Sequence, residues 1–224
     1  MNVTYIGQAG LLMEKDGFII MVDPYLSNSI EKINPNNYRR VPVDEALFNI
    51  KPDVMIFTHN HLDHYDPDTV KRFINENSNI TVLAPKSVWG EVRKFGGNNN
   101  YVMFNRHTHW TQSNIEFTAV KAEHSDETPI GVIVDDGEHK YYITGDTLLN
   151  DEIFEDIPSD IYALFLPVNG VGNNMNMIDA ARFAKRVNAE KCVPIHIGMF
   201  DELSADEFEC KNKVVAQIYK KIEL

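Results

Sequence analysis

The sequence predicts an α+β fold, a four-layer αββα sandwich in which two mixed β-sheets pack together and helices cover their outer faces. Short apolar segments separated by turn residues fill most of the first two thirds of the chain, and strands alternate with helices in the last third. No linker-like stretch interrupts the 224 residues, of which 43% are hydrophobic. We therefore expect a single domain over residues 1–224.

The N-terminal part of the chain predicts a group of short strands. Apolar segments at 3–6, 11–14 and 18–22 indicate three of them, and Asp16-Gly17 between the last two is a strong hairpin signal. A polar loop over 27–42 should follow.

Helices enter the pattern in the middle of the chain. A helix should begin at Pro67, because proline suits the first turn of a helix. The elements around it are strands at 54–57 and 80–84, a helix over 86–95, and further strands between 101 and 120.

The last third combines strands with two helices. In order, it should contain a hairpin of strands 130–135 and 140–144, a strand at 161–166, a helix capped by Asn176, a strand at 191–195 and a final helix over 204–220. The helix after Asn176 should run to about residue 188, with an apolar face formed by Ile178, Ala181, Ala184 and Val187.

Charge and cysteine count exclude several classes of protein. The 21 basic and 33 acidic residues give a net charge of −12, which disfavours a nucleic-acid partner. The chain has no run of about 18 apolar residues that would predict a membrane span. Its N-terminus lacks signal-peptide features, so we expect a cytoplasmic protein. Cys192, on a strand, and Cys210, on a helix, should both be reduced.

The most informative motif follows the predicted strand at 54–57. It places His59, His61, Asp63 and His64 within six positions of one loop. Zinc and related ions bind imidazole nitrogen and carboxylate oxygen at about 2.0–2.2 Å. Burying three imidazoles beside a carboxylate without a partner would cost several kcal/mol. The motif therefore predicts a metal site.

Three further ligand-capable residues stand where predicted strands end. His124, Asp146 and His196 each follow an apolar strand, and each alone would be typical of a turn. Together with the first motif they form a series of donors that strand ends could deliver to one edge of a sheet.

These motifs, in this order, resemble those of the metallo-β-lactamase fold superfamily, and the resemblance covers essentially the whole chain. Within the superfamily the sequence is most similar to the L-ascorbate-6-phosphate lactonase-like branch. The segments that carry this closer similarity are Gly7-Gln8-Ala9-Gly10, Asp23-Pro24-Tyr25-Leu26, Asn36-Asn37-Tyr38-Arg39-Arg40, Pro85-Lys86, Asn174-Met175-Asn176, Pro194-Ile195-His196 and Met199-Phe200.

The resemblance implies a binuclear site. One divalent ion would be held by His59, His61 and His124, and a second by Asp63, His64 and His196, with Asp146 bridging the two. The lactonases of the similar branch need not have histidine at the position of His124, so its presence favours a complete two-metal site and weakens transfer of the exact lactonase activity. Zn or Mn are the metals we expect, and the ligand types also suit Fe.

Such a site predicts hydrolysis. Two divalent ions can share a water and lower its pKa, so that a metal-bridged hydroxide attacks a carbonyl or phosphoryl group. Asp63 and Asp146 would be essential to catalysis as the charged ligands. The resemblance also discriminates between chemistries: true β-lactamases usually have cysteine where this chain has Asp146, and the diiron reductases of the fold have glutamate where it has His61.

Substrate contacts are less well indicated by the sequence. Arg39 and Arg40 precede the metal motif and suit a phosphate or carboxylate, although a solvated loop explains them equally simply. Asn174 lies before a helix whose amides could face an anion, whereas for Asn176 capping is the better interpretation. Asp23 either orients a ligand histidine from behind or forms an Asp-Pro turn.

The leading hypothesis is thus a metal-dependent hydrolase, lactonase-like, that acts on a small anionic ester or a phosphorylated sugar lactone. A phosphodiesterase acting on a small or cyclic phosphodiester is the first alternative, and a non-catalytic metal-binding module is the second. The expected partner is a small-molecule substrate, with no nucleic acid and no membrane. The sequence leaves open whether the chain forms a homo-oligomer.

Overall fold

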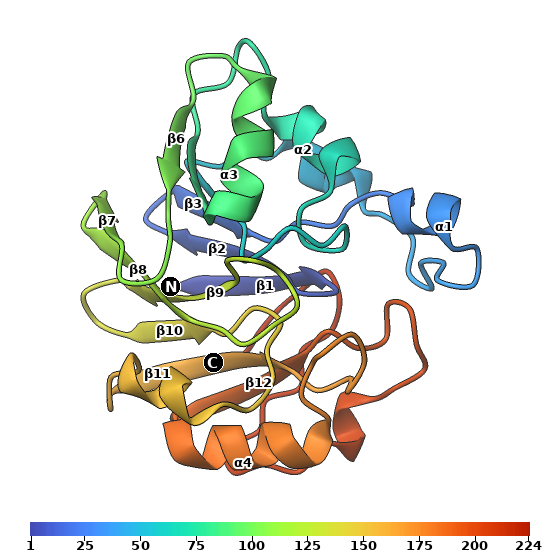
Figure 1. Cartoon of the computed structure of the whole chain (residues 1–224), viewed down its shortest axis with the longest axis vertical. Helices are drawn as coiled ribbons and strands as arrows, with labels where there is room; N and C mark the ends of the chain where they lie inside the picture. Colours follow the sequence, from blue (N-terminus) through green and yellow to red (C-terminus); the bar gives the residue numbers. More distant parts are fainter.

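Two mixed β-sheets face each other across the middle of the molecule, and helices cover their outer faces (Figure 1). The structure, a computed structural model, describes all residues, 1–224. The first sheet has the order β13 (Lys220–Lys221), β1 (Asn2–Gly7), β2 (Gly10–Lys15), β3 (Phe18–Val22), β4 (Val54–Ile56), β5 (Thr81–Ala84) and β6 (Asn100–Met103). The second has the order β12 (Lys191–Ile195), β11 (Ile161–Pro167), β10 (Lys140–Ile143), β9 (Ile130–Asp135), β8 (Ile115–Lys121) and β7 (His109–Gln112). The predicted fold class is confirmed.

The strand pairing explains why one end of the sandwich gathers functional loops. Strands β3 to β6 are parallel, as are β10 to β12. Strand β9 is antiparallel to both of its neighbours, so β8 points in the same direction as β10. The loops that leave β8, β10 and β12 therefore emerge at the same edge of the second sheet.

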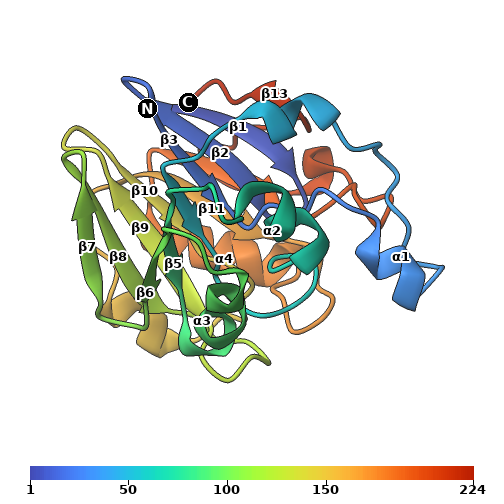
Figure 2. The same ribbon diagram turned by 90° about the horizontal axis from the view of Figure 1, so that it is seen from above.

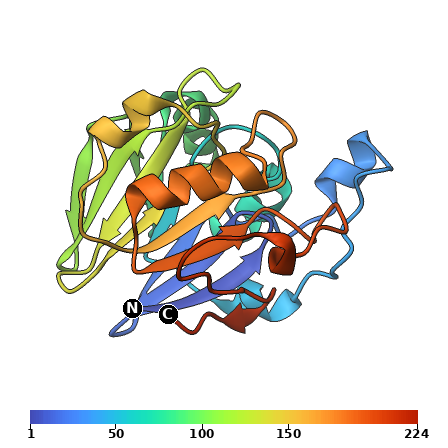
Figure 3. The same cartoon turned by 90° about the horizontal axis from the view of Figure 1, so that it is seen from below.

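Successive side chains of a strand point to opposite faces of its sheet, one toward the other sheet and the next toward the outer helices. Val54 and Ile56 of β4 face the other sheet and belong to the central core, whereas Met55 between them packs with the outer helices. Helices α2 (Pro67–Phe73) and α3 (Lys86–Val92) lie on the outer face of the first sheet (Figure 2). Helix α4 (Met177–Val187) crosses the outer face of the second sheet (Figure 3). None of the helices combines the length and the apolar character that spanning a bilayer requires.

The helix ends follow the predicted capping rules. Pro67 occupies the first turn of α2, and the Asp66 carboxylate accepts hydrogen bonds from two backbone amides there. Asn176 caps α4 in the same way. The predicted apolar face of α4 was partly wrong, because Ile178 is 68% exposed. The residues of α4 that are buried also recur at helical spacing, but the buried face begins at Ala180 instead of Ile178. It consists of Ala180, Phe183, Ala184 and Val187.

The predicted C-terminal helix over 204–220 was also wrong. Only a short 3-10 turn, η4 (Ala205–Glu207), forms there, and the chain then runs extended, so Cys210 lies in a loop. The Val214 amide donates to the Cys192 carbonyl, and the Tyr219 amide donates to the Tyr5 carbonyl. Backbone groups that a helix would pair internally are thus paired with strands of the two sheets, and this tertiary pairing outweighs helical propensity.

The other elements fall close to their predicted positions. The polar loop at 27–42 contains a short helix, α1 (Ser29–Ile33), that the sequence did not predict and that projects from the side of the sandwich (Figure 1). The remaining elements are the 3-10 turns η1 (Glu45–Asn49), η2 (Arg93–Phe95) and η3 (Asp151–Glu155).

A buried carboxylate fixes the loop after η3 to the second sheet. The Asp156 side chain, 7% exposed, accepts hydrogen bonds from Arg106 Nε and Nη2 at 2.7 and 2.9 Å and from the Lys121 amide at 2.8 Å. Burial alone would raise its pKa, but these donors outweigh burial and lower the pKa to about 2. A charged Asp156 is therefore part of the folded state.

Asp156→Asn should lower the free energy of unfolding by about 2 kcal/mol at neutral pH, the usual size of a hydrogen bond to a charged group. Because the folded-state pKa of Asp156 lies below that of an ordinary carboxyl, its contribution is full above about pH 4 and is lost as pH falls through 2. Urea unfolding of metal-free protein at pH 7 and pH 3 checks this. The difference in free energy of unfolding between Asp156→Asn and the native chain should be smaller at pH 3 than at pH 7. Asp160 is a nearby exposed aspartate, and Asp160→Asn should have little effect at either pH. An unchanged difference at pH 3 would contradict the assignment.

Candidate metal centre

Seven histidine and aspartate side chains meet at the edge where the strands deliver their loops. The motif from His59 to His64 follows β4, and His124, Asp146 and His196 follow β8, β10 and β12. A hydrogen bond from the Ile130 amide to the Thr58 carbonyl, 3.0 Å, joins the end of β4 to the start of β9 in the other sheet. The two sheets therefore contribute side chains to one place.

The first group comprises His59, His61, His124 and Asp146, whose potential ligand atoms all lie within 4.8 Å of one another. His124 Nε2 is 3.0 Å from His61 Nδ1. The His59 and His124 imidazoles are buried, and His61 is partly buried. Three nitrogens and one oxygen converge here.

The second group comprises Asp63, His64 and His196. His64 Nε2 and His196 Nε2 are 3.2 Å apart, and His196 Nε2 is 3.2 Å from Asp63 Oδ2. Asp146 Oδ1 lies 3.2 Å from both imidazole nitrogens, whereas its Oδ2 lies 3.8 Å from His124 Nε2. Asp146 thus stands between the two groups, as expected of a bridging carboxylate.

The side chains fit divalent ions. Bonds of about 2.0–2.2 Å place neighbouring ligand atoms roughly 3.0–3.6 Å apart. The distances given above fall in this range except the one between Asp146 Oδ2 and His124 Nε2. His59 Nε2 is buried and has no hydrogen-bond partner, and buried Asp146 Oδ1 makes no well-aligned hydrogen bond although two imidazole nitrogens lie 3.2 Å from it. A buried polar atom left unpaired costs about 1–3 kcal/mol, so two such atoms in one cluster need an explanation. An ion bound by both groups provides one.

Asp23 supports this cluster from inside the protein. It is fully buried, and its Oδ2 lies 2.8 Å from His64 Nδ1. The same carboxylate accepts hydrogen bonds from the Thr58 amide and hydroxyl, at 2.8 and 2.6 Å. With His64 Nδ1–H donating to Asp23, Nε2 is the ring nitrogen left to face the other site residues. The structure therefore places Asp23 where the sequence suggested an orienting carboxylate.

Asn174 points toward Asp146 instead of toward solvent. It is 5% exposed, and its amide nitrogen donates to Asp146 Oδ2 at 2.8 Å while its carbonyl oxygen accepts from the Thr147 amide at 3.0 Å. Asn176 caps α4. The geometry of Asn174 indicates that it orients Asp146, and a contact with substrate stays a prediction.

The two arginines are engaged within their own loop. Arg39 donates to the carbonyls of Tyr25 and Val41 and to the Tyr219 hydroxyl. Arg40 donates to the Tyr38 hydroxyl and lies 3.8 Å from the exposed Glu202 carboxylate. Arg40 is therefore the freer of the two, and substrate binding by either stays a prediction.

Sequence reasoning missed two residues that touch the site. Thr58 joins Asp23 to His59, because its hydroxyl lies 3.0 Å from His59 Nδ1. Gln8 lies in the turn between β1 and β2, and its Nε2 donates a hydrogen bond to Asp63 Oδ2 at 2.8 Å. Gln8 belonged to a segment that carried the family resemblance, but nothing in the sequence indicated which residue its side chain would meet.

The electrostatics of the cluster are dominated by its carboxylates. Burial disfavours the charged forms of His64 and His196, but the attraction of Asp146 and the other nearby carboxylates outweighs burial. The pKa of His64 is therefore raised well above its usual value, and the pKa of His196 is raised to about 10. The same pairing outweighs burial of Asp63 and Asp146 and lowers the pKa of both. Burial lowers the pKa of His59 and of His124.

These shifts predict proton release on metal binding. In metal-free protein at pH 7 His64 and His196 are protonated, whereas a metal ligand must be neutral, so loading zinc should release about two protons per chain. The release can be measured with an indicator dye in weak buffer, and apparent zinc affinity should fall as pH is lowered. Zinc binding without proton release would contradict the predicted protonation of this pair.

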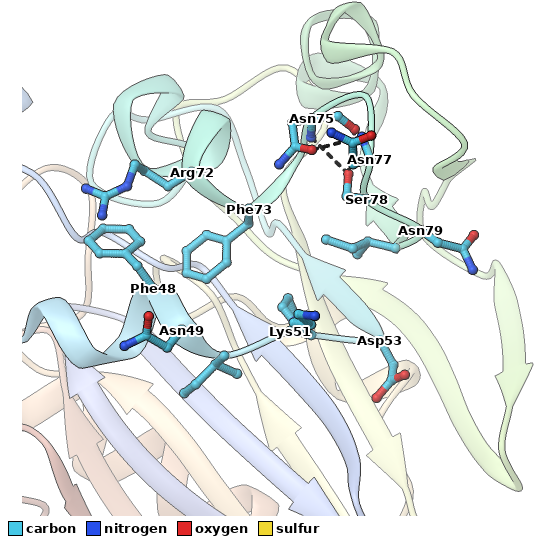
Figure 4. A pocket seen from close by; sticks show the side chains of 13 residues that line it. Phe48, Asn49, Lys51, Asp53, Arg72, Phe73, Asn75, Asn77, Ser78 and Asn79 are labelled. Carbon is cyan, nitrogen blue, oxygen red and sulfur yellow. Dashed lines mark hydrogen bonds between the residues drawn. The ribbon is translucent and has the colours of Figure 1, made fainter.

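A large cavity lies elsewhere in the molecule. It has a volume of about 640 Å³ and is lined by residues before β4 and β5, including Asp53 and Ile80 (Figure 4). Arg72 lies over the ring of Phe48 at its edge, 3.7 Å from the ring centroid. The candidate metal centre follows the opposite end of β4, so this cavity does not open onto it.

Comparisons with known proteins identify the family and the fold of the chain. The model of the family described as "Beta-lactamase superfamily domain" matches residues 19–197. A UPF0173 metal-dependent hydrolase of Methanopyrus kandleri is 26% identical over 227 residues, covering 96% of this chain and 91% of the relative. One from an Exiguobacterium species is 29% identical over 228 residues, covering 92% and 90%. The solved structure of Igni18, a metallo hydrolase from Ignicoccus hospitalis, has the same fold, with a TM-score of 0.78, 21% identity, and coverage of 98% of this chain and 96% of that one.

Proposed function

The chain belongs to the Beta-lactamase superfamily domain family, and from this we propose that it is a metal-dependent hydrolase acting on a small anionic ester, with a phosphorylated sugar lactone as the leading substrate class. The observation that carries the proposal is the position of Asp146. Its two carboxylate oxygens face two different groups of ligand-capable side chains, and one of these oxygens is buried without a well-aligned hydrogen bond. The relatives named metal-dependent hydrolases support the hydrolase part of this proposal.

Each residue of the cluster has a role in this proposal. His59, His61 and His124 would hold one divalent ion, Asp63, His64 and His196 would hold the other, and Asp146 would bridge them. When bound, such ions polarise the bond under attack and lower the pKa of a shared water. The protein's part is to hold the ligands in place, through Asp23 behind His64 and Asn174 beside Asp146. Cys192 and Cys210 line a groove beside α4, so neither is positioned as a nucleophile.

The choice of an anionic substrate rests on the charge of the site and its surroundings. Two divalent ions would add four positive charges to a cluster that contains two carboxylates, so the loaded site would attract anions. Arg40, in the loop before the metal motif, has a partly exposed guanidinium whose one carboxylate neighbour is 3.8 Å away. That side chain could turn toward a phosphate or carboxylate group of a substrate at little cost.

The proposal is tested by metal content and turnover measured together. Purified protein is stripped with chelator, reloaded separately with Zn²⁺ or Mn²⁺, and assayed on phosphorylated lactones, simple lactones and a chromogenic phosphodiester. The expected result is near two ions per chain and metal-dependent opening of phosphorylated lactones. Turnover of the phosphodiester alone would replace the substrate class with the small phosphodiesters. Tight metal binding without turnover of any ester would overturn the proposed activity.

A further inference from the structure

Gln8 occupies a turn whose backbone is fixed against the second group of site residues. It lies between β1 and β2 with φ of 52°, a left-handed conformation that residues with side chains rarely adopt. Its carbonyl accepts hydrogen bonds from the Tyr5 hydroxyl at 2.7 Å and from the His196 amide at 2.8 Å. A strained residue persists where its surroundings determine its conformation, and such residues cluster at functional sites.

The side chain of Gln8 is aimed into the site. The residue is 3% exposed, and its amide nitrogen is placed 2.8 Å from Asp63 Oδ2. The same atom is 3.1 Å from His196 Nε2 and 3.2 Å from His196 Nδ1. Near-equal distances to both ring nitrogens mean that the amide does not donate along the lone pair of either one. The contact with His196 is thus not explained as an ordinary hydrogen bond.

The spacing around Gln8 is that of a ligand. Its amide tip stands 2.8 and 3.1 Å from Asp63 Oδ2 and His196 Nε2, which are themselves 3.2 Å apart. Neighbouring ligand atoms around one divalent ion lie roughly 3.0–3.6 Å apart. The distances that involve His196 fall in this range, and the 2.8 Å distance, a hydrogen bond in the present orientation of the amide, is slightly shorter. A half-turn of the amide exchanges its nitrogen and oxygen without moving the rest of the side chain. The turned amide places an oxygen among the ligands of the second group.

We propose that Gln8 is a further ligand of the second metal site, supplying its amide oxygen beside Asp63, His64 and His196. The inference rests on the metal centre of the proposed function. It makes the two sites chemically different. The first has three imidazole nitrogens and the Asp146 carboxylate, a set that suits zinc. The second has two nitrogens and three oxygens, and carboxylate and carbonyl oxygens suit harder ions such as Mn²⁺.

Mn²⁺ binding to four chains tests the proposal: the native protein, Gln8→Met, Gln8→Glu and Gln217→Met. Methionine keeps the length of the side chain but offers no oxygen, and glutamate restores one. Gln217 is an exposed glutamine in the C-terminal segment, so its variant controls for the chemical change alone. Metal per chain is measured after dialysis, and affinity is measured from the electron paramagnetic resonance signal of free Mn²⁺.

We expect the native chain and Gln217→Met to bind two Mn²⁺ ions. In Gln8→Met one of the two ions should lose at least about tenfold in affinity while the other is unchanged, and Gln8→Glu should bind both at least as tightly as the native chain. Native affinity for both ions in Gln8→Met would overturn the inference and leave the proposed function standing. A native chain that binds no metal would overturn the proposed function itself.

Cobalt spectra separate a ligand from a residue that only orients Asp63. Losing a ligand lowers the coordination number at the second site and strengthens its visible absorption bands, whereas replacing a residue that only orients a still-bound Asp63 would weaken binding with unchanged bands. Weaker binding of Gln8→Met with an unchanged cobalt spectrum would therefore overturn the assignment. Circular dichroism of metal-free Gln8→Met checks its fold, and Gln8→Glu keeps the proposal testable should the methionine variant not fold.

Discussion

Asp146→Asn is expected to lower metal-dependent hydrolysis by about a thousandfold, which corresponds to about 4 kcal/mol of transition-state stabilisation. The substitution keeps the shape of the side chain but removes the charge that faces both groups of site residues. Asp146 Oδ1 lies 3.2 Å from His64 Nε2 and His196 Nε2 of the second group, and its Oδ2 lies 3.8 Å from His124 Nε2 of the first group.

The measurement is the rate at saturating substrate together with metal content per chain. Asp206→Asn, an exposed aspartate in η4, is the matched control and should leave both unchanged. Because Asn174 can still hydrogen-bond an amide at position 146, the variant should keep its circular dichroism spectrum. Native turnover by Asp146→Asn would show that the bridging position of this carboxylate has no part in catalysis.

Asp23→Asn is expected to weaken metal binding by about 10- to 100-fold although Asp23 is not itself among the seven site residues. The carboxylate receives three donors, namely the Thr58 amide, the Thr58 hydroxyl and, across 2.8 Å, His64 Nδ1. An asparagine would turn a donor of its own toward one of these groups. Either His64 would lose its orientation or the loop that carries the metal motif would shift.

Competition with a chromophoric chelator gives the metal affinity, and urea unfolding of metal-free protein gives the stability. Asp53→Asn is the matched control. Asp53 lies at the other end of β4, and its carboxylate accepts a hydrogen bond from the Ile19 amide at 2.8 Å. The control should lose stability but not metal affinity, whereas Asp23→Asn should lose both. Equal metal affinities for the two variants would mean that Asp23 serves the fold alone.

Most of the fold could be predicted because local patterns and tertiary packing agree. The hairpin at Asp16-Gly17 and the cap at Asn176 depend on residues within a few positions, and both are present. The segment after Ser204 could not be predicted in this way. Its backbone pairs with Cys192 and Tyr5, which are remote in the sequence. The order of apolar and polar residues within the segment does not indicate such partners.

The same distinction between local patterns and remote contacts applies to the candidate site. Its seven ligand-capable residues follow strands, so strand prediction and residue type were enough to find them. The residues that contact these seven could not be found in this way, because the direction in which their side chains point is determined only by the folded structure. Asn174 could be noticed before α4, but not that it would turn toward Asp146. Gln8 meets Asp63 and His196 across 55 and 188 positions of sequence.

The extended C-terminal segment has a consequence for solubility. Its residues pair with β12 through Asn212 and Val214, and it then forms β13 against β1, so one stretch of chain covers an outer strand of each sheet. Uncovered outer strands present unpaired amides and carbonyls to which other chains can add, which is a common route to aggregation. A helix over the same residues would have left both outer strands exposed. The extended conformation therefore shields two surfaces prone to self-association with one short segment.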